Sequence, residues 1–402
     1  MNIIILTSSM ADSDFISYAS KAKIKPNPSN QNFYNKLIKC LSLNNKVFAV
    51  SLRPFCKGMF DEEELKESRG VEGTVSYYYT KESTSKVYKA TKLHKDIAST
   101  IEEIIREENL DSFVILVDTL RFGLVKAAKM IRNNYDCKVV GVVTDNPNNL
   151  SNVKKSFVKT VLKSSNDLDA YVCLTERLNR IFNERGKPYY LLEGIVEDIE
   201  KEKKLPIGEY IFFGGALYER YGVKNLVNAF HKIDSKVNFV IAGSGELQKY
   251  INDLALKDKR ILYLSQVDKK MVYNLEQNAL LNVNPRPYSI TLDNESVPSK
   301  LIEYIASGAP TMSTVHTTLR ALFPEDVLWI DDSSENGIME SLKQYLDKKD
   351  HNEDIKRAAS ARIRVYELYG FNTQSSSLSG FLESVRTDVI SWVNLSTDKL
   401  AS

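Results

Sequence analysis

Four charged residues stand close together in the last third of the chain, in a Pro-rich loop and the segment that follows it. They are Arg286, Glu295, Lys300 and Glu303. Basic side chains hold phosphate groups, and carboxylates accept hydrogen bonds from sugar hydroxyls. Because a nucleotide-sugar contains both a diphosphate and sugars, this combination predicts a site for a ligand of that class.

A buried strand and a helix are expected to position these residues. The apolar residues 280–283 predict the strand. The helix is expected to begin at Pro298, where the fixed φ of proline and its missing N–H cost least, and to end at Ser307-Gly308, a helix stop signal. Free backbone N–H groups at such a helix start, next to basic side chains, form a site for an anion.

The composition is that of a soluble globular protein with more than one core. The chain has 402 residues, of which 43% are apolar and 26% are charged. A net charge of +2 gives no case for nucleic-acid binding. The four cysteines form no CxxC pair and the four histidines share no metal-ligand spacing, so we expect neither a zinc site nor a disulfide framework. A reducing compartment fits this usage best. No apolar run approaches the ~18 residues of a membrane span.

Short apolar runs alternate with helical patterns, which indicates an α/β protein with parallel sheets. Strands are expected at residues 3–7, 47–51, 75–79, 113–117, 139–143, 171–174, 189–192, 211–213, 239–242, 261–264, 280–283, 311–314 and 327–330. Besides the helix at Pro298, helices are expected at residues 32–43, 96–108, 120–133, 149–162, 176–183, 223–233, 246–256, 269–277, 335–346, 352–366 and 372–395.

The charged stretch 197–204, which ends near Pro206, suits an exposed connection between two domains. We therefore predict one Rossmann-like domain at residues 1–200 and a second at residues 206–370. A final helix within residues 371–402 is expected to return to the first domain. Two such sheets leave a cleft at the carboxyl ends of their strands, where ligands bind in sheets of this kind.

Motifs in the second half resemble those of the GT-B glycosyltransferases of family 4, which act with retention. The resemblance rests on the spacing Glu295-(seven residues)-Glu303 and on the runs NPRP (284–287), ESVPSKLIEYIASGAP (295–310) and FGGALYERYGVKNLVNAF (213–230). These runs are similar to the exopolysaccharide and capsule branch of that family. Weaker matches in the first half are TDNP (144–147), LTE (174–176) and LEGIV (192–196).

The resemblance implies two Rossmann-like domains that face each other across a cleft, the first binding the acceptor and the second the donor. The implied enzyme is cytoplasmic, with peripheral contact to the inner face of the plasma membrane as an option. It would move a hexose-type sugar from a UDP- or GDP-linked donor to a glycan or lipid-diphosphate-linked acceptor in cell-surface polysaccharide synthesis. No metal, no other cofactor and no nucleic-acid partner are implied.

The same resemblance assigns roles to individual residues. Glu295 would face the transferred sugar and Glu303 the ribose hydroxyls, while Arg286 and Lys300 would hold the phosphates. The backbone would approach the diphosphate at Gly214, Gly215, Val297, Pro298 and Ser299. The glycines that would shape the nucleotide pocket, because side chains there would block it, are Gly243 and Gly245.

Three positions depart from the pattern of the family. Ala216 and Tyr221 stand where many members carry an arginine and a lysine, so Arg220 becomes a further candidate for phosphate charge. Asp145 stands near a position where many members carry a histidine that contacts the donor sugar, and its carboxylate could hold a sugar hydroxyl. These departures keep open an alternative, a catalytically inactive GT-B subunit that binds glycan and supports a partner transferase. A sugar-nucleotide epimerase of related architecture is disfavoured because the histidines are isolated.

Residues 150–163 predict a basic amphipathic helix. Its apolar positions are Leu150, Val153, Phe157 and Val161, and its lysines are Lys154, Lys155, Lys159 and Lys163. Such a helix could rest against anionic lipid headgroups, which would suit a lipid-diphosphate acceptor. It could equally be an outer helix of the first sheet with a solvated basic edge.

Overall fold

The computed structural model divides the chain into two compact units. Unit 1 comprises Met1–Glu197 together with Phe371–Ser402, and unit 2 comprises Asp198–Gly370. The structure describes residues 1–150, 153–198, 200, 205–289 and 295–389. Each unit is built around one main parallel sheet.

The main sheet of unit 1 has eight strands in the order β10-β9-β8-β7-β1-β2-β5-β4. Every pair in it is parallel except β4 with β5. The strands are β1 (Asn2–Thr7), β2 (Lys46–Ser51), β4 (Ser68–Glu72), β5 (Val75–Tyr79), β7 (Phe113–Asp118), β8 (Cys137–Val143), β9 (Ala170–Cys173) and β10 (Tyr189–Leu191). A separate antiparallel pair is formed by β3 (Glu64–Leu65) and β6 (Glu82–Ser83).

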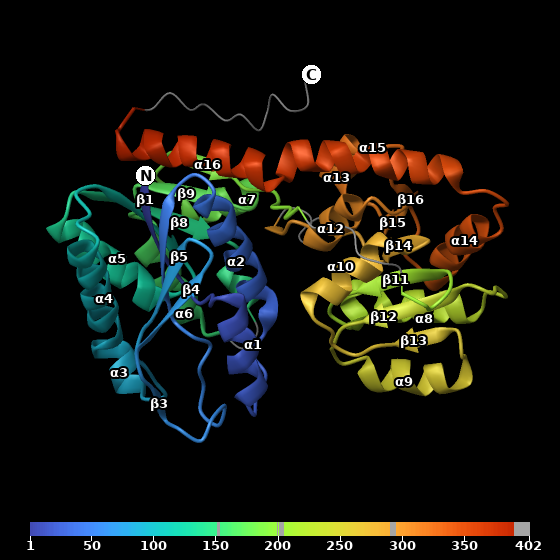
Figure 1. The fold of residues 1–402 in the computed structure, drawn as a ribbon, viewed down its shortest axis with the longest axis horizontal. Helices are drawn as coiled ribbons and strands as arrows, with labels where there is room; N and C mark the ends of the chain where they lie inside the picture. Colours follow the sequence, from blue (N-terminus) through green and yellow to red (C-terminus); the bar gives the residue numbers. More distant parts are fainter. Residues whose placement is uncertain (151–152, 199, 201–204, 290–294, 390–402) are drawn as a thin grey trace. The chain divides into compact units, whose positions relative to one another are not determined.

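Helices cover both faces of this sheet, and its central strands are therefore continuous apolar runs. One face packs against α3 (Lys86–Thr91), α4 (Leu93–Glu107), α5 (Phe122–Asn134), α6 (Lys155–Ser165) and α7 (Glu176–Phe182). The other face packs against α2 (Pro28–Ser42) and α16 (Phe371–Arg386). Figure 1 shows α4 and α5 on one side of the strands and α2 on the other.

The chain returns to unit 1 at Phe371. Buried Cys40 on α2 lies 3.4 Å from the carbonyl oxygen of Phe371, and Asn44 donates to the hydroxyl of Ser375 at 2.9 Å. Lys138 on β8 pairs with Asp388 just beyond α16. Helix α16 thus belongs to the core of unit 1, although 331 positions separate Cys40 from Phe371.

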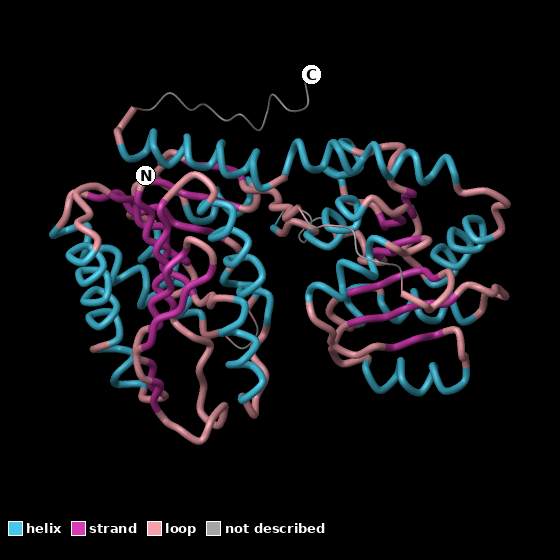
Figure 2. The backbone as a smooth tube through the Cα atoms, viewed as in Figure 1, coloured by secondary structure: helices cyan, strands magenta, loops and turns pink. Residues whose placement is uncertain are grey.

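Unit 2 has six parallel strands in the order β13-β12-β11-β14-β15-β16. They are β11 (Tyr210–Gly214), β12 (Asn238–Ala242), β13 (Ile261–Tyr263), β14 (Leu281–Asn284), β15 (Thr311–Thr314) and β16 (Leu328–Ile330). The chain builds outward from β11 in one direction and then from β14 in the other. This is the doubly wound order, and β11 and β14 form its switch point. In Figure 2 these strands run side by side in magenta.

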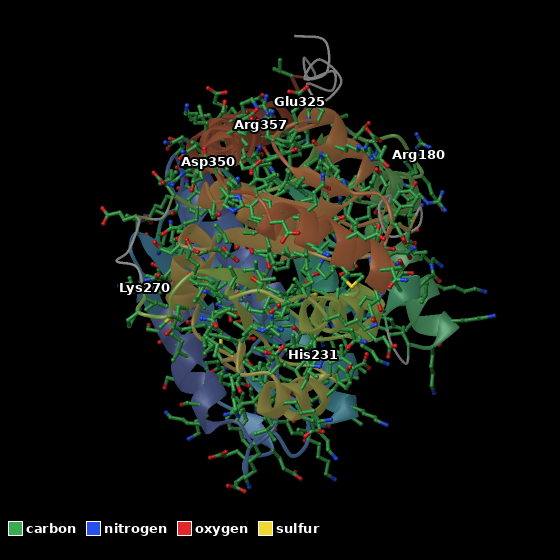
Figure 3. The ribbon with its side chains drawn as sticks, turned by 90° about the vertical axis from the view of Figure 1, so that its right-hand side faces the viewer. Arg180, His231, Lys270, Glu325, Asp350 and Arg357 are labelled. Carbon is green, nitrogen blue, oxygen red and sulfur yellow. The ribbon has the colours of Figure 1, made fainter. Side chains whose placement is uncertain are left out.

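Helices again lie on both faces of the sheet of unit 2. Side chains from α8 (Val223–His231), α9 (Gln248–Lys257) and α14 (Glu335–Leu346) fill one core. Side chains from α10 (Lys269–Gln277) and α12 (Ser299–Ser307) fill the other. The remaining helices are α13 (Thr317–Leu322) and α15 (Asn352–Tyr369), and α15 packs against α12. Arg357 on α15 donates to the carbonyl oxygen of Glu325, and both residues are labelled in Figure 3.

The predicted α/β architecture is confirmed, and three local predictions are wrong. Helix α6 begins at Lys155 rather than at residue 149, because residues Pro147–Asn149 form a short 3-10 turn and Leu150 is extended. Residues 8–29 contain an unexpected helix, α1 (Asp12–Lys21), which has no side-chain cap and no fully buried residue. The last helix ends at Arg386 rather than at residue 395, and residues 390–395 of its predicted range lie outside the described residues.

No helix in the described ranges is both long and apolar enough to cross a membrane.

Candidate functional site

The candidate residues of unit 2 gather at the carboxyl edge of its sheet. Gly214 ends β11, Gly243 follows β12, and Arg286 follows β14. Glu295 and the start of α12 come after Arg286, with residues 290–294 outside the described part of the chain. The loops after β11 and β14 leave the sheet at its switch point, where doubly wound sheets bind ligands.

Helix α12 begins one residue later than predicted. Pro298 is its N-cap, with φ −78° and ψ 72°, and no side chain caps the helix start. The N–H of Ser299 donates to the carbonyl oxygen of Val297 at 2.9 Å, so it is already engaged. Lys300 therefore contributes the next backbone amide of the first turn, where helix amides lack intrahelical partners.

The side chain of Lys300 lies between two carboxylates. Its ammonium is 2.9 Å from Glu303 and 3.5 Å from Glu276, a residue of α10 that the sequence did not single out. Burial lowers the pKa of Lys300, but the carboxylates of Glu303 and Glu276 outweigh this effect and hold the pKa above its ordinary value. Lys300 is therefore a charged positioning residue for Glu303, and its charge is offset before any phosphate arrives.

Glu276 is the functional candidate that sequence reasoning missed. Its side chain is 1% exposed, whereas that of Lys300 is 39% exposed. A carboxylate buried to this degree needs a partner, and Lys300 supplies one. Glu276 sits at the end of a helix with mixed polar residues, so only the packing of α10 against α12 reveals its role.

Two arginines meet at the ring of Tyr221. The guanidinium carbon of Arg220 is 4.9 Å from the ring centroid, and that of Arg286 is 6.0 Å away. Gly222, with φ +75°, brings the loops together, because a Cβ there would lie 2.0 Å from the carbonyl oxygen of Pro285. The residue that replaces the lysine of the resembled family thus holds two cations in place, since aromatic faces attract guanidinium groups.

Arg286 is fixed at both ends. Its Nη2 donates to the hydroxyl of Ser296 at 2.7 Å, and its carbonyl oxygen accepts from the hydroxyl of Thr314 at the end of β15. Ser296 is the neighbour of Glu295, which is itself buried. The structure therefore brings Arg286 and the Glu295 segment together, as the sequence spacing suggested.

The glycines of the site are explained by contacts within the protein. The N–H of Gly214 donates to the Tyr304 hydroxyl at 2.9 Å, and the N–H of Gly215 donates to Ala242. A Cβ at Gly243 would lie 1.8 Å from the Gly215 carbonyl oxygen, and one at Gly245 would lie 2.5 Å from that of Leu217. Gly243 and Gly245 thus let the loop after β12 approach the loop after β11. The roles that the resemblance gives the four glycines at the phosphates and the nucleotide pocket stay a prediction.

Asp145 belongs to unit 1. It is exposed and follows β8, so it stands at the carboxyl edge of the sheet of unit 1. Its neighbour Asn146 is buried, and its side chain accepts from the N–H of Asn148 in the short turn that follows. Among the described residues, no group of three or more histidine, cysteine, aspartate and glutamate side chains is arranged to hold a metal ion.

Residues 196–362 match the family model described as "Glycosyl transferases group 1", which spans almost all of unit 2 and less than half of the chain. No curated protein matches the sequence.

Solved structures with the same fold cover nearly the whole chain. A sucrose-phosphate synthase from Thermosynechococcus elongatus is 11% identical with a TM-score of 0.61, covering 96% of this chain and 100% of its own. HepE from Anabaena, solved with UDP and glucose, is 11% identical with a TM-score of 0.63, covering 96% and 100%. A trehalose-6-phosphate protein from E. coli, bound with UDP-2-fluoro glucose, is 10% identical with a TM-score of 0.63, covering 95% and 99%.

At such low identity these similarities establish the fold alone. The chain has the GT-B fold of glycosyltransferases, with two Rossmann-like units, and its second unit matches the group 1 family model. The solved structures that it resembles are named for trehalose and sucrose phosphate synthesis or for HepE, and none of these names concerns a capsule transferase of family 4.

Proposed function

We propose that this chain is a retaining glycosyltransferase that moves a sugar from a UDP- or GDP-linked donor to a glycan or lipid-linked acceptor in cell-surface polysaccharide synthesis. Unit 2 would hold the donor, and unit 1 the acceptor. The observation that carries the proposal is the arrangement at the switch point of unit 2. Two arginines share the Tyr221 ring there, and the Lys300–Glu303–Glu276 group stands at the start of α12.

This arrangement suits the charge that develops during transfer. Breaking a glycosyl–phosphate bond places negative charge on the departing diphosphate and positive charge on the anomeric carbon. Arg286 and Arg220 are prepositioned cations for the first charge, and fixed groups of this kind lower a barrier without reorganising. Glu303, held by Lys300, would accept hydrogen bonds from the ribose, and Glu295 would face the transferred sugar.

The proposed reaction needs no dedicated base and no metal. In the resembled family the departing phosphate helps to remove the proton of the acceptor hydroxyl. Two arginines beside a helix start can supply the positive charge that a divalent cation would otherwise bring. Addition of EDTA to the purified protein should therefore leave the rate of transfer unchanged, and full recovery of a lost rate by Mg²⁺ would contradict this part of the proposal.

Donor hydrolysis is the direct test of the function. Purified protein is mixed with a panel of UDP- and GDP-linked sugars without acceptor, and the release of free nucleotide is followed. The true donor should also raise the melting temperature, because a ligand that binds only the folded state stabilises it by mass action. A sugar-nucleotide that shifts the melting temperature and is slowly hydrolysed would identify the donor.

One observation favours the alternative of an inactive subunit. The charge of Lys300 is offset by two carboxylates, and the amides of Gly214 and Gly215 are engaged within the protein. An inactive subunit would bind a nucleotide or a glycan without hydrolysing any donor. Stabilisation by a nucleotide-sugar with no release of nucleotide, at any enzyme concentration, would favour this alternative.

Peripheral membrane contact is part of the proposal through α6. Val161 is buried in the core of unit 1, whereas Phe157 is 39% exposed beside the exposed residues Lys155, Lys159 and Lys163. Basic side chains beside an exposed aromatic residue favour anionic lipid surfaces. Flotation with anionic vesicles at low salt should recover the protein, and a Phe157→Ser variant should remain at the bottom of the gradient.

A further inference from the structure

A row of buried polar side chains lies at the carboxyl edge of the sheet of unit 1. We call it the polar row, and it consists of Ser8, Ser51, Arg53, Glu82 and Asp118. One side-chain atom of each residue is buried and has no hydrogen-bond partner among the residues that the structure describes. These atoms are Ser8 Oγ, Ser51 Oγ, Arg53 Nε, Glu82 Oε1 and Asp118 Oδ2.

The polar row follows four neighbouring strands. Asp118 ends β7, Ser8 follows β1, Ser51 ends β2, and Glu82 comes shortly after β5. These strands are adjacent in the order β7-β1-β2-β5. Arg53 links the segments that follow β2 and β5. It lies just after β2, and its Nη2 donates to the carbonyl oxygen of Thr80, which follows β5, at 2.7 Å.

The polar row also marks the switch point of this sheet. From β1 the order continues to β2 and β5 on one side and to β7 and β8 on the other. In a doubly wound sheet, ligands bind outside the carboxyl ends of the strands at such a point. The buried polar atoms therefore stand where the topology of unit 1 places a ligand.

Buried polar atoms without partners are rare because each one costs folding free energy. Ser51 and Asp118 have no exposed surface, Ser8 is 3% exposed and Glu82 is 5% exposed. Their burial is thus deep enough for the cost to apply. Five such atoms share this one edge of the sheet, which indicates that the edge is kept for a function.

The polar row combines hydrogen-bond donors with acceptors, and cationic side chains stand beside its carboxyl groups. Nε of Arg121 lies 3.9 Å from Oδ2 of Asp118, and the charges of Arg53, Arg121 and Lys89 all act on Glu82. Serine hydroxyls, carboxyl oxygens and a guanidinium N–H together offer both donors and acceptors, the combination that a ring carrying several hydroxyls requires.

Burial also raises the pKa of Glu82 to about 8, against the opposing charges of Arg53, Lys89 and Arg121. Near neutral pH this carboxyl group therefore holds its proton and can donate a hydrogen bond. Burial raises the pKa of Asp118 as well, and the Tyr34 hydroxyl on α2 faces the same carboxyl group. A carboxyl group that keeps its proton, as Glu82 does, is compatible with a neutral sugar.

We propose that the polar row binds a neutral sugar ring of the acceptor. The inference rests on the proposed function, in which unit 1 takes the acceptor. It assigns the recognition of that acceptor to sugar hydroxyls rather than to a phosphate or a lipid diphosphate. Near this edge, α1 has no fully buried side chain, and the Tyr18 hydroxyl donates to the carbonyl oxygen of Pro54 in the loop after β2.

The first experiment measures binding of free sugars to the full-length protein by saturation-transfer NMR. The probes are D-glucose, D-galactose, D-mannose and N-acetyl-D-glucosamine, with inorganic phosphate and glucose 6-phosphate for comparison. At least one neutral sugar should bind saturably, and phosphate should not compete with it. Absence of saturable binding by all four sugars would overturn the proposal, as would displacement of the bound sugar by phosphate.

The second experiment compares two buried serines of unit 1. Ser51→Ala removes a hydroxyl that has no protein partner, so the melting temperature should stay the same or rise, while sugar affinity falls about tenfold. Ser375→Ala is the matched control, since its hydroxyl accepts from Asn44 Nδ2 at 2.9 Å. This control should melt earlier and bind sugar as the wild type does. Unchanged affinity in Ser51→Ala would mean that the polar row holds water only, and the proposal would fail.

Isosteric variants of the two carboxyl groups of the polar row test their hydrogen-bonding chemistry without changing the shape of the side chains. Glu82→Gln and Asp118→Asn keep the volume of each side chain, and Asp118→Asn keeps the oxygen that accepts from the N–H of Leu120 at 3.0 Å. Each should weaken sugar binding several-fold without changing donor hydrolysis. Loss of donor hydrolysis in the wild type with sugar binding intact would reject the proposed function alone, whereas intact hydrolysis with no sugar binding would reject the polar row alone.

Discussion

The carboxyl edges of the two sheets differ in how their polar groups are partnered. In unit 2, Lys300 is paired with Glu303 and Glu276, and Arg286 is bonded to Ser296 and placed against Tyr221. In unit 1, side-chain atoms of the polar row are buried without partners among the described residues. Both edges lie at the switch point of a doubly wound sheet.

The difference teaches what kind of ligand each edge can take. Charged groups that are fixed before binding suit a ligand whose charge grows during reaction. Such groups were already oriented when the protein folded, so they need not reorganise when the charge develops. Buried polar atoms without partners suit a ligand that brings its own donors and acceptors. We therefore propose that unit 2 is organised for a diphosphate and unit 1 for hydroxyl groups, and the following changes test this contrast.

The largest effect is expected from Arg286→Ala. Removing one prepositioned donor to a developing negative charge costs about 100- to 1,000-fold in rate. We therefore expect donor hydrolysis to fall by that factor, with partial recovery in Arg286→Lys, which keeps the charge but loses the bond geometry. The rate of nucleotide release measures the effect. Arg357→Ala on α15 is the matched control and should hydrolyse the donor as the wild type does, and equal rates in both variants would remove Arg286 from the site.

Two glycines of unit 2, Gly243 and Gly215, allow a matched test of whether the loops after β11 and β12 are in fixed contact. Gly243→Ala places a Cβ 1.8 Å from a backbone oxygen at φ +142°, whereas a Cβ at Gly215 would meet its nearest atom at 3.5 Å. We expect Gly243→Ala to lower the free energy of unfolding by about 1–3 kcal/mol and Gly215→Ala by about 0.5 kcal/mol or less. Urea unfolding of both variants measures the difference. Equal stabilities would show that the two loops are not in fixed contact.

The Lys300 group tests whether unit 2 depends on its internal pairing. Lys300→Met leaves Glu276 buried beside an apolar side chain, which costs about 3–5 kcal/mol for a fully buried pair. Because Lys300 is 39% exposed, we expect a smaller loss, about 1–3 kcal/mol. Urea unfolding checks this value. Adding Glu276→Gln should restore most of the lost stability, and a double variant as unstable as Lys300→Met would show that the carboxylate is not the cause.

Much of this arrangement could be predicted from the sequence. The strands are short apolar runs, and the loop–helix segment from Arg286 to Glu303 is contiguous, so local patterns place its residues near one another. The start of α12 was misplaced by only one residue, because Pro298 caps the helix instead of opening it. Local sequence signals were therefore sufficient to predict the fold and the backbone elements of the candidate site.

What the sequence could not give depends on contacts between distant segments. From the sequence alone, Tyr221 is only a tyrosine at a position where the resembled family carries a lysine. The structure shows that Gly222 lies close to Pro285 and that the Tyr221 ring lies beside two arginines. Glu276 carried no motif, since its partner lies on another helix. Ser51 and Asp118 end apolar strands, and only their shared edge reveals that they belong together.

The last and smallest effect concerns pH and the polar row. Burial raises the pKa of Glu82 from an ordinary value of 4.5 to about 8, with Arg53, Lys89 and Arg121 facing it and Tyr18 and Tyr88 nearby. Between these two values the folded chain binds more protons than the unfolded chain, so the stability that this group contributes is full below about pH 4.5 and is lost as the pH rises towards about 8.

Glu82→Gln removes this titration. We therefore expect the variant to gain stability relative to the wild type as the pH is raised from about 5 to about 9, with the gain levelling off above about 8. Urea unfolding across this range measures it. Asp167→Asn is a suitable control, because Asp167 is half-exposed and paired with Arg132, and its pKa is lowered rather than raised. A constant difference between Glu82→Gln and wild type at every pH would show that Glu82 is ionised throughout, and Glu82 would then not be the uncharged donor that the polar row needs for a neutral sugar.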